Sequence, residues 1–182
     1  MARKNKTIIA LYGPAGTGKT AVAGKLCRKL SGRTARISVD IMRDMTCICL
    51  KGGWKESDEY ITSAKKVVLP LTKEYLKLGY NVVIEVAPPT VFDVGKTDKW
   101  LAISLKKIGA NVFLLDAPLK SVLKRNKERK GDFGQGNLSK ELTKKLYNYC
   151  QKYLDKKDFI VINTEKIGAD KTTVLILEKI KL

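Results

Sequence analysis

The chain has 182 residues and a formal net charge of +18, and its 44% hydrophobic and 30% charged residues are typical of one ordinary α/β domain. No apolar run approaches the roughly 20 residues that span a bilayer, and the basic start precedes too short an apolar stretch for a signal peptide, so we expect one cytoplasmic domain over residues 1–182 without membrane contact. The sequence contains no histidine, which excludes histidine-ligated metals and leaves carboxylates, lysine, tyrosine and cysteine as candidate general bases.

Short β-branched segments alternate with longer amphipathic segments along the chain. Strands are expected at residues 7–12, 36–39, 81–86, 111–115 and 159–162, and helices at residues 18–30, 57–78, 97–108, 119–129, 139–154 and 170–180. Gly79 and Gly109, each just before an expected strand, have the position of helix C-caps. This alternation predicts a parallel sheet with helices on both faces.

The loop after the first strand matches the phosphate-binding pattern G-x-x-x-x-G-K-[ST] in residues Gly13, Pro14, Ala15, Gly16, Thr17, Gly18, Lys19 and Thr20. Glycines let successive backbone N–H groups turn toward phosphate oxygens, and the following helix adds the positive end of its dipole. We therefore expect ATP to bind here, with Lys19 on the β- and γ-phosphates and the Thr20 hydroxyl on Mg²⁺. A glycine turn that binds no nucleotide is the alternative.

The second strand is followed by Asp40 and, three residues on, by Arg43. Ligands of an open parallel sheet bind beyond the carboxyl ends of its strands, so Asp40 is expected in the cleft, where its carboxylate can accept the proton of an acceptor hydroxyl. Arg43 can hold an anionic group of that acceptor through two parallel hydrogen bonds. The alternative for Asp40 is that it caps the next helix.

The third strand carries one acid, Glu85, inside an apolar segment. A carboxylate in a buried strand is costly unless it is paired or faces a metal or a polar cleft. Glu85 is therefore expected to hold a water on Mg²⁺ or to contact the acceptor. A structural ion pair, with Lys19 as the candidate partner, is the alternative.

Arg125 and Arg129 lie four residues apart on one expected helix and therefore on the same face of it. They directly precede a segment with three glycines in six residues, Gly131 to Gly136, which is expected to form a lid over residues 129–138. The two arginines can clamp the phosphates or the adenine ring when the lid closes. A solvated basic helix face and an ordinary surface loop are the alternatives.

Taken in order, these segments resemble a group of P-loop kinases that includes phage-type polynucleotide 5′-hydroxyl kinase, zeta-toxin and chloramphenicol phosphotransferase. The resemblance rests on residues 13–20, on 40–43 (D-I-M-R), on the strand at 79–85, and on D-A-P-L at 116–119 leading into R-N-K-E-R at 125–129. It implies the three-layer P-loop fold of kinases, with a five-stranded parallel sheet in the order 2-3-1-4-5. It also implies Asp40 as the general base, Arg43 on a 3′-phosphate of the acceptor, and Arg125 and Arg129 as lid arginines on ATP. The strand-three acid is commonly aspartate in this group, whereas this chain has Glu85.

The leading hypothesis is an ATP-dependent phosphotransferase that moves the γ-phosphoryl group to an acceptor hydroxyl. The high positive charge, Arg43, and Trp54 or Tyr60 as stacking platforms fit a polynucleotide 5′-hydroxyl or a nucleotide. The lysines are spread along the chain, however, so a solvated basic surface and a small-molecule acceptor such as an antibiotic, nucleoside or sugar stay open. A regulatory ATPase that transfers phosphate only to water, with Gln135 orienting that water, is a third hypothesis.

Overall fold

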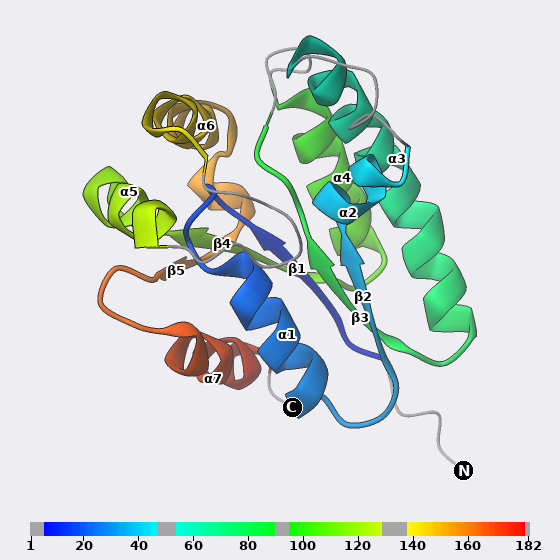
Figure 1. The fold of residues 1–182 in the computed structure, drawn as a ribbon. Helices are drawn as coiled ribbons and strands as arrows, with labels where there is room; N and C mark the ends of the chain where they lie inside the picture. The colour runs from blue at the N-terminus through cyan, green and yellow to red at the C-terminus, as the bar shows by residue number, and fades with distance from the viewer. Residues whose placement is uncertain (1–5, 47–53, 90–94, 129–137, 181–182) are drawn as a thin grey trace.

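The computed structural model describes residues 6–46, 54–89, 95–128 and 138–180. Its centre is a parallel sheet in the order β2-β3-β1-β4-β5, which confirms the predicted topology. The strands are β1 (Ile8–Tyr12), β2 (Thr34–Ser38), β3 (Asn81–Glu85), β4 (Asn111–Asp116) and β5 (Ile160–Asn163). Because β1 is the middle strand, the loop that follows it opens at the centre of the carboxyl edge of the sheet (Figure 1).

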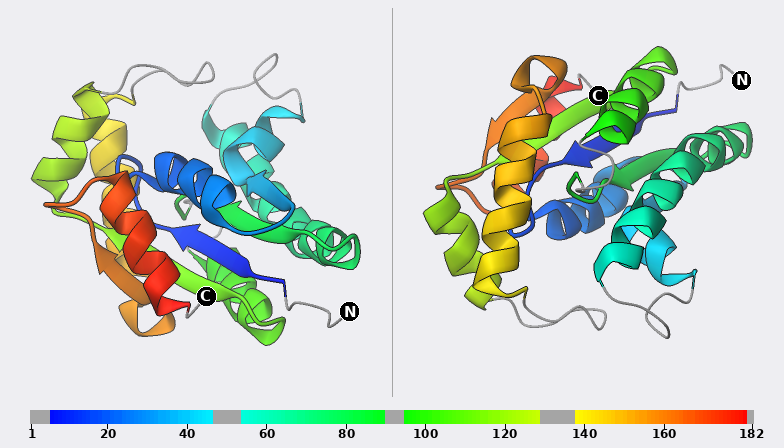
Figure 2. Two further views of the ribbon diagram at one scale, coloured as in Figure 1. Left: turned by 90° about the horizontal axis from the view of Figure 1, so that it is seen from below. Right: turned by 90° about the horizontal axis from the view of Figure 1, so that it is seen from above.

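Helices cover both faces of the sheet (Figures 1 and 2). One apolar cluster joins the sheet to two helices, α1 (Lys19–Lys29) and α7 (Ala169–Lys179). The second cluster, on the other face, contains residues of α3 (Trp54–Lys77), α4 (Lys96–Lys107) and α6 (Lys140–Tyr153). The remaining helical segments are α2 (Val39–Asp44), α5 (Leu119–Glu128) and the 3-10 turn η2 (Lys156–Asp158).

Each central strand is buried on both sides, because its side chains alternate between the two clusters. In β1, Ile9 and Leu11 face α1 and α7, whereas Ala10 and Tyr12 face the other layer. The same alternation puts Glu85 on the face of β3 that α1 covers, since Val83 two residues before it belongs to the α1 cluster. This placement decides which groups Glu85 can meet.

The second strand begins and ends earlier than its sequence predicts. It pairs with β3 from Thr34 to Ser38, and Val39 already belongs to the short helix α2. The reason is a capping interaction, because the Ser38 side chain accepts a hydrogen bond from the Ile41 backbone N–H at 3.5 Å. Ser38 is therefore the N-cap, and the alternative in which Asp40 caps this helix is wrong.

The two glycines expected to end helices do so. Gly79 and Gly109 have φ values of +82° and +85°, the left-handed conformation that lets the chain turn from a helix into the next strand. The Gly79 N–H donates to the Leu76 carbonyl and the Gly109 N–H to the Lys106 carbonyl, so otherwise unpaired carbonyls of the last helical turn are satisfied.

An ion pair lies inside the layer formed by α3 and α4. The Lys65 Nζ is 2.8 Å from the Asp98 Oδ2, and neither side chain has any exposed surface. Lys65 also donates to the Pro88 carbonyl at 3.2 Å, so it links both helices to the segment that follows β3. A buried pair of this kind repays its desolvation only while both partners are present.

We expect Asp98→Ala to lower the free energy of unfolding by about 3–5 kcal/mol, because it leaves the Lys65 charge buried without its carboxylate. Replacing both partners by apolar residues of similar size, Lys65→Met with Asp98→Leu, is expected to be close to neutral. Urea denaturation measures both values. Glu74→Gln, which changes an exposed pair with Lys77, is the control and should stay within about 0.5 kcal/mol. A double variant as unstable as Asp98→Ala would contradict this account.

Candidate functional site

The phosphate-binding loop joins β1 to α1 through three glycines with positive φ, Gly13, Gly16 and Gly18. At Gly13 glycine is required sterically as well, because a Cβ would overlap the Leu115 carbonyl oxygen of β4. Thr17 closes the turn, with its hydroxyl donating to the Pro14 carbonyl at 2.8 Å. The backbone thus curls back before α1 begins, as a phosphate cradle requires.

Lys19, the first residue of α1, is buried and its ammonium group is folded onto the loop. Its Nζ donates to the carbonyls of Gly13 at 2.7 Å and Pro14 at 3.0 Å. These contacts keep a cation at the mouth of the loop, where the β- and γ-phosphates of a bound nucleotide would lie.

Glu85 forms an ion pair with Arg36 of β2, so the structural ion pair given as the alternative is present, with Arg36 rather than Lys19 as its partner. Both side chains lie on the α1 face of the sheet, because Arg36 and Glu85 occupy matching alternate positions of neighbouring strands. Thr20 follows Lys19 on α1, the helix that covers this same face. The carboxylate therefore lies on the sheet face that α1 covers, the helix that carries Thr20, the residue expected to bind Mg²⁺.

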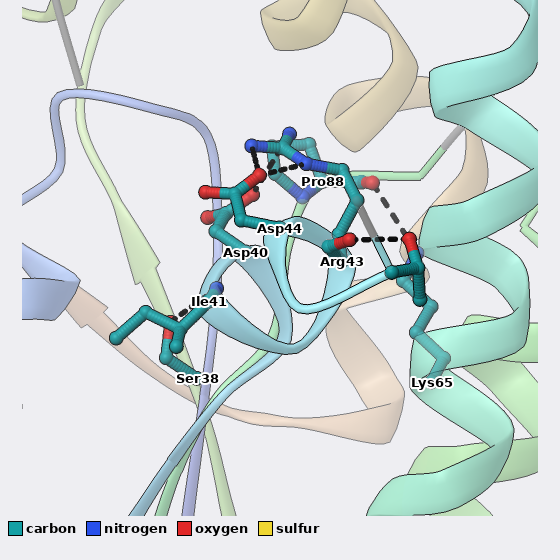
Figure 3. A network of polar contacts seen from close by, with 8 residues as sticks. Ser38, Asp40, Ile41, Arg43, Asp44, Lys65 and Pro88 are labelled. Atoms are coloured by element: carbon teal, nitrogen blue, oxygen red, sulfur yellow. Dashed lines mark hydrogen bonds and ion pairs between the residues drawn. The ribbon is translucent and has the colours of Figure 1, made fainter. Parts of the chain in front are cut away.

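Three charged residues of α2 form a local network at the end of β2. The Arg43 Nε and Nη2 donate to the Asp44 Oδ1 at 2.8 and 2.6 Å, and the Arg43 Nη1 lies 3.6 Å from the Asp40 Oδ1. Figure 3 shows both carboxylates pointing the same way from the helix, with the guanidinium beside them. Two strand spacings of about 4.8 Å separate β2 from β1. The end of β2, which Asp40 follows, therefore lies about 10 Å across the sheet from the phosphate-binding loop.

Arg125 of α5 is fixed to the turn after β5. Its guanidinium donates to the Thr164 hydroxyl at 3.2 Å and to the carbonyls of Thr164 and Glu165. Thr164 is itself held by β4, because its N–H donates to the Asp116 carbonyl at 2.7 Å. Arg125 is thereby positioned by the sheet, whereas Arg129 and all but the last residue of the lid expected over residues 129–138 lie outside the described residues.

A cavity of about 140 Å³ lies beside the loop between α1, α5 and the start of α7. It is smaller than the roughly 300–1,000 Å³ of a complete small-molecule site, so it fits one part of a ligand. Its lining combines polar and apolar residues, namely Thr17, Gly18, Val22, Arg125, Ile167, Gly168, Ala169 and Thr172. A nucleobase could pack against the apolar residues and contact the Arg125 guanidinium.

Three residues of the site were not predicted from the sequence: Arg36, Asp44 and Thr164. Arg36 could have been identified from the sequence, because Arg36 and Glu85 are the only charged residues within two otherwise uncharged strand segments. Asp44 lies four residues after Asp40 and next to Arg43, a spacing that predicts a shared helix face only once a helix is known there. Nothing in the local sequence predicts the role of Thr164, because its contact with Arg125 joins residues that are 39 positions apart. The side chain of Trp54, the other expected stacking platform, lies outside the described part, and Tyr60 is partly exposed on α3.

Two buried ionisable groups lie under the loop on the α3–α4–α6 side. Burial, with the Asp98 carboxylate as a second cause, raises the pKa of Tyr12 well above its usual value. Burial also raises the pKa of the Cys150 thiol to about 12, a rise that the nearby Lys19 charge opposes. Both groups are therefore neutral at physiological pH and leave the charge of Lys19 undiminished.

We expect Gly13→Ala to destabilise the fold by more than about 2 kcal/mol and to abolish nucleotide binding, because the methyl group overlaps the Leu115 carbonyl. Gly24→Ala is the matched control. In the interior of α1 its methyl group would meet nothing closer than the Arg28 Nη1 at 3.8 Å, so stability should rise by about 0.5–1 kcal/mol. Thermal unfolding and the binding of a fluorescent ATP analogue measure both effects; normal binding by Gly13→Ala would refute the packing argument.

The pKa of Cys150 predicts a dependence of stability on alkaline pH. Since the folded-state pKa is raised, the thiol contributes stability below the unfolded pKa of about 9 that is lost as pH rises toward 12. Between about pH 8.5 and 10.5 the free energy of unfolding should fall by about 2 kcal/mol from this thiol. We expect Cys150→Ala to unfold with a shallower pH dependence over this range in urea titrations, and equal slopes would speak against it.

The described helices include none that is both long and apolar enough to cross a membrane. No functionally curated protein matches the sequence.

Among solved structures, the tunicamycin resistance protein of Deinococcus radiodurans is 22% identical with a TM-score of 0.63, over 97% of this chain and 96% of that one.

Two kinases share the fold at still lower identity. The thymidylate kinase of Candida albicans is 13% identical with a TM-score of 0.64, over 97% of this chain and 92% of that one. The shikimate kinase of Bacteroides thetaiotaomicron is 17% identical with a TM-score of 0.61, over 97% and 99%. A family model described as AAA domain matches residues 8–152, more than half of the chain. The phosphate-binding loop, the parallel sheet around it and this match agree: the chain belongs to the AAA domain family and has a P-loop kinase-like fold.

Proposed function

We propose that this protein transfers the γ-phosphoryl group of Mg-ATP to an acceptor hydroxyl, with Asp40 as the general base. The observation that carries the proposal is the arrangement of the carboxyl edge of the sheet. The phosphate-binding loop follows β1, Asp40 follows Ser38 of β2, and Glu85 ends β3 between these two strands. The proposed donor site and this carboxylate thus lie at the same edge of the sheet, separated by one strand.

The donor side fits ATP. The backbone of the glycine loop supplies N–H groups to the phosphates, and Lys19 exchanges its two loop carbonyls for phosphate oxygens when the nucleotide binds. The cavity beside the loop receives the nucleobase, and Arg125 is one of the residues that line it. The Thr164 and Glu165 carbonyls already hold the Arg125 guanidinium beside this cavity, so contact with the nucleobase requires no movement of the backbone. The predicted contribution of Arg129 belongs to the same step.

The residues present also fit Mg²⁺. In the part of the chain that the structure describes, no three histidine, cysteine, aspartate or glutamate side chains gather in a metal cage. Mg²⁺ in kinases needs none, because it is held by one or two protein oxygens together with phosphates and waters. The Thr20 hydroxyl would be the protein ligand and Glu85 would hold a coordinated water, which requires the carboxylate to share or leave its pair with Arg36. Bound Mg²⁺ neutralises charge on the transferring phosphoryl group.

In the transfer step, the acceptor oxygen attacks the γ-phosphorus as its proton passes to the Asp40 carboxylate. The bond from the γ-phosphorus to the bridging oxygen breaks, and ADP leaves with the negative charge that Lys19 stabilises. The Arg43 Nη1 lies 3.6 Å from the Asp40 Oδ1 on the same helix. The narrower resemblance, to polynucleotide 5′-hydroxyl kinase and its relatives, stays a prediction about the acceptor.

We expect Asp40→Asn to lower the rate of phosphoryl transfer by roughly 10²–10⁴, because it removes the proton acceptor without changing the size of the side chain. The affinity for Mg-ATP should stay unchanged, because Asp40 follows β2, whose end lies about 10 Å from the phosphate-binding loop. A broad acceptor screen with radiolabelled ATP identifies the product, and rate and affinity are then measured separately. Glu178→Gln, near the exposed end of α7, removes the same charge and should leave both unchanged.

If the wild-type protein hydrolyses ATP but phosphorylates no acceptor in that screen, and Asp40→Asn hydrolyses ATP equally fast, the kinase proposal is wrong. Hydrolysis that a protein or nucleic acid stimulates, without a phosphorylated product, would identify a regulatory ATPase instead.

A further inference from the structure

The guanidinium that faces the acceptor is already engaged by a second carboxylate. Arg43 is only 20% exposed, and both its Nε and its Nη2 donate to the same oxygen of Asp44. This edge of the guanidinium is the one that would otherwise bind a phosphate through two parallel hydrogen bonds. The third nitrogen, Nη1, is directed at Asp40. Arg43 therefore behaves as the centre of a carboxylate–guanidinium–carboxylate group (Figure 3).

The charge of this group is opposite to that of the whole chain. One arginine between two aspartates leaves a local charge of −1, although the chain carries +18. Charges farther away than the Debye length of about 8–10 Å are largely screened, whereas groups within 4 Å are not. An anionic group brought to Arg43 would thus meet the Asp44 carboxylate at close range and would have to displace it.

The hydrogen-bonding capacity of the group indicates what it accepts instead. Ionised carboxylates only accept hydrogen bonds, so a ligand beside Asp40 and Asp44 must bring donors such as hydroxyl or ammonium groups. Apolar side chains of the same two helices are exposed. Ile41 and Met45, four residues apart at α2, are 47% and 75% exposed. Tyr60 is 37% exposed on α3, the helix against which α2 packs. Such side chains can cover a carbon ring or chain.

On the basis of the kinase activity proposed above, we infer that the acceptor is an uncharged or cationic alcohol with several hydrogen-bond donors, and that Asp44 excludes acceptors bearing a phosphate next to the reacting hydroxyl. Asp44 is then a specificity-determining residue. A purely structural role explains the pair less well, because an ion pair with a carboxylate this exposed stabilises a fold very little. A polynucleotide acceptor is the outcome that this inference opposes.

The test uses inorganic phosphate as the probe and a non-hydrolysable ATP analogue with Mg²⁺ to saturate the phosphate-binding loop. The NMR signal of the Arg43 Nε–H group, assigned by its loss in Arg43→Lys, reports phosphate binding at this position. We expect Asp44→Asn, which keeps the size and an acceptor oxygen, to bind phosphate about five- to tenfold more tightly than the wild-type protein. Glu74→Gln, an equal change of charge on the exposed end of α3, should bind phosphate as the wild-type protein does.

Equal phosphate affinity of Asp44→Asn and the wild-type protein would overturn the inference, and so would an equal gain in Glu74→Gln, which would indicate net charge as the cause. Thermal unfolding of each variant shows that the fold is retained. A second comparison uses adenosine and adenosine 3′-monophosphate as acceptors; faster transfer to the phosphate-bearing compound by the wild-type protein would also overturn it. If the broad acceptor screen also yields no phosphorylated compound, the proposed kinase activity fails, while the phosphate titration still decides the role of Asp44.

Discussion

The site depends on one close backbone contact, in which Gly13 at the end of β1 lies against the Leu115 carbonyl at the end of β4. A side chain at position 13 would push these strand ends apart, and the chain could not curl back into the loop before α1. The order of the sheet makes this contact consequential. Because β1 is central, the loop opens between the end of β3, with Glu85, and the end of β4, whose Asp116 carbonyl fixes the turn that holds Arg125.

Polar groups around this contact are held by partners from distant parts of the chain. Arg125 is fixed by Thr164, and Thr164 by Asp116, so α5 is tied to two strands at once. On the other side, Lys65 links α3, α4 and the Pro88 carbonyl in a fully buried pair. Each such group would be costly to bury alone. The shape of the site is therefore coupled to the packing of both helical layers.

Electrostatics act on two scales in this protein. The lysine-rich surface gives the chain a large net positive charge, which favours the approach of any anion, nucleotide or nucleic acid. Within a few ångströms of Asp40, however, the two carboxylates of α2 outweigh Arg43. The net charge of the chain and the local charge of the α2 group, the proposed acceptor site, have opposite signs, so the first cannot be used to infer the second.

The amino-acid sequence by itself determined the alternation of strands and helices, the phosphate-binding loop and the positions of Asp40, Glu85 and Arg125 at strand or helix ends, whereas the strand order was implied by the family resemblance. Local physics sufficed for these, because glycine spacing, hydrophobic period and strand-end position all act over a few residues. Only the tertiary structure decided the partners: Arg36 rather than Lys19 for Glu85, Thr164 for Arg125, and Asp44 for Arg43. Ser38, not Asp40, caps α2, and the helix that begins there places Asp40, Arg43 and Asp44 on one face. The pairings of Glu85 with Arg36 and of Arg125 with Thr164 depend on which segments are neighbours and which face a side chain occupies, and neither is determined by the local sequence.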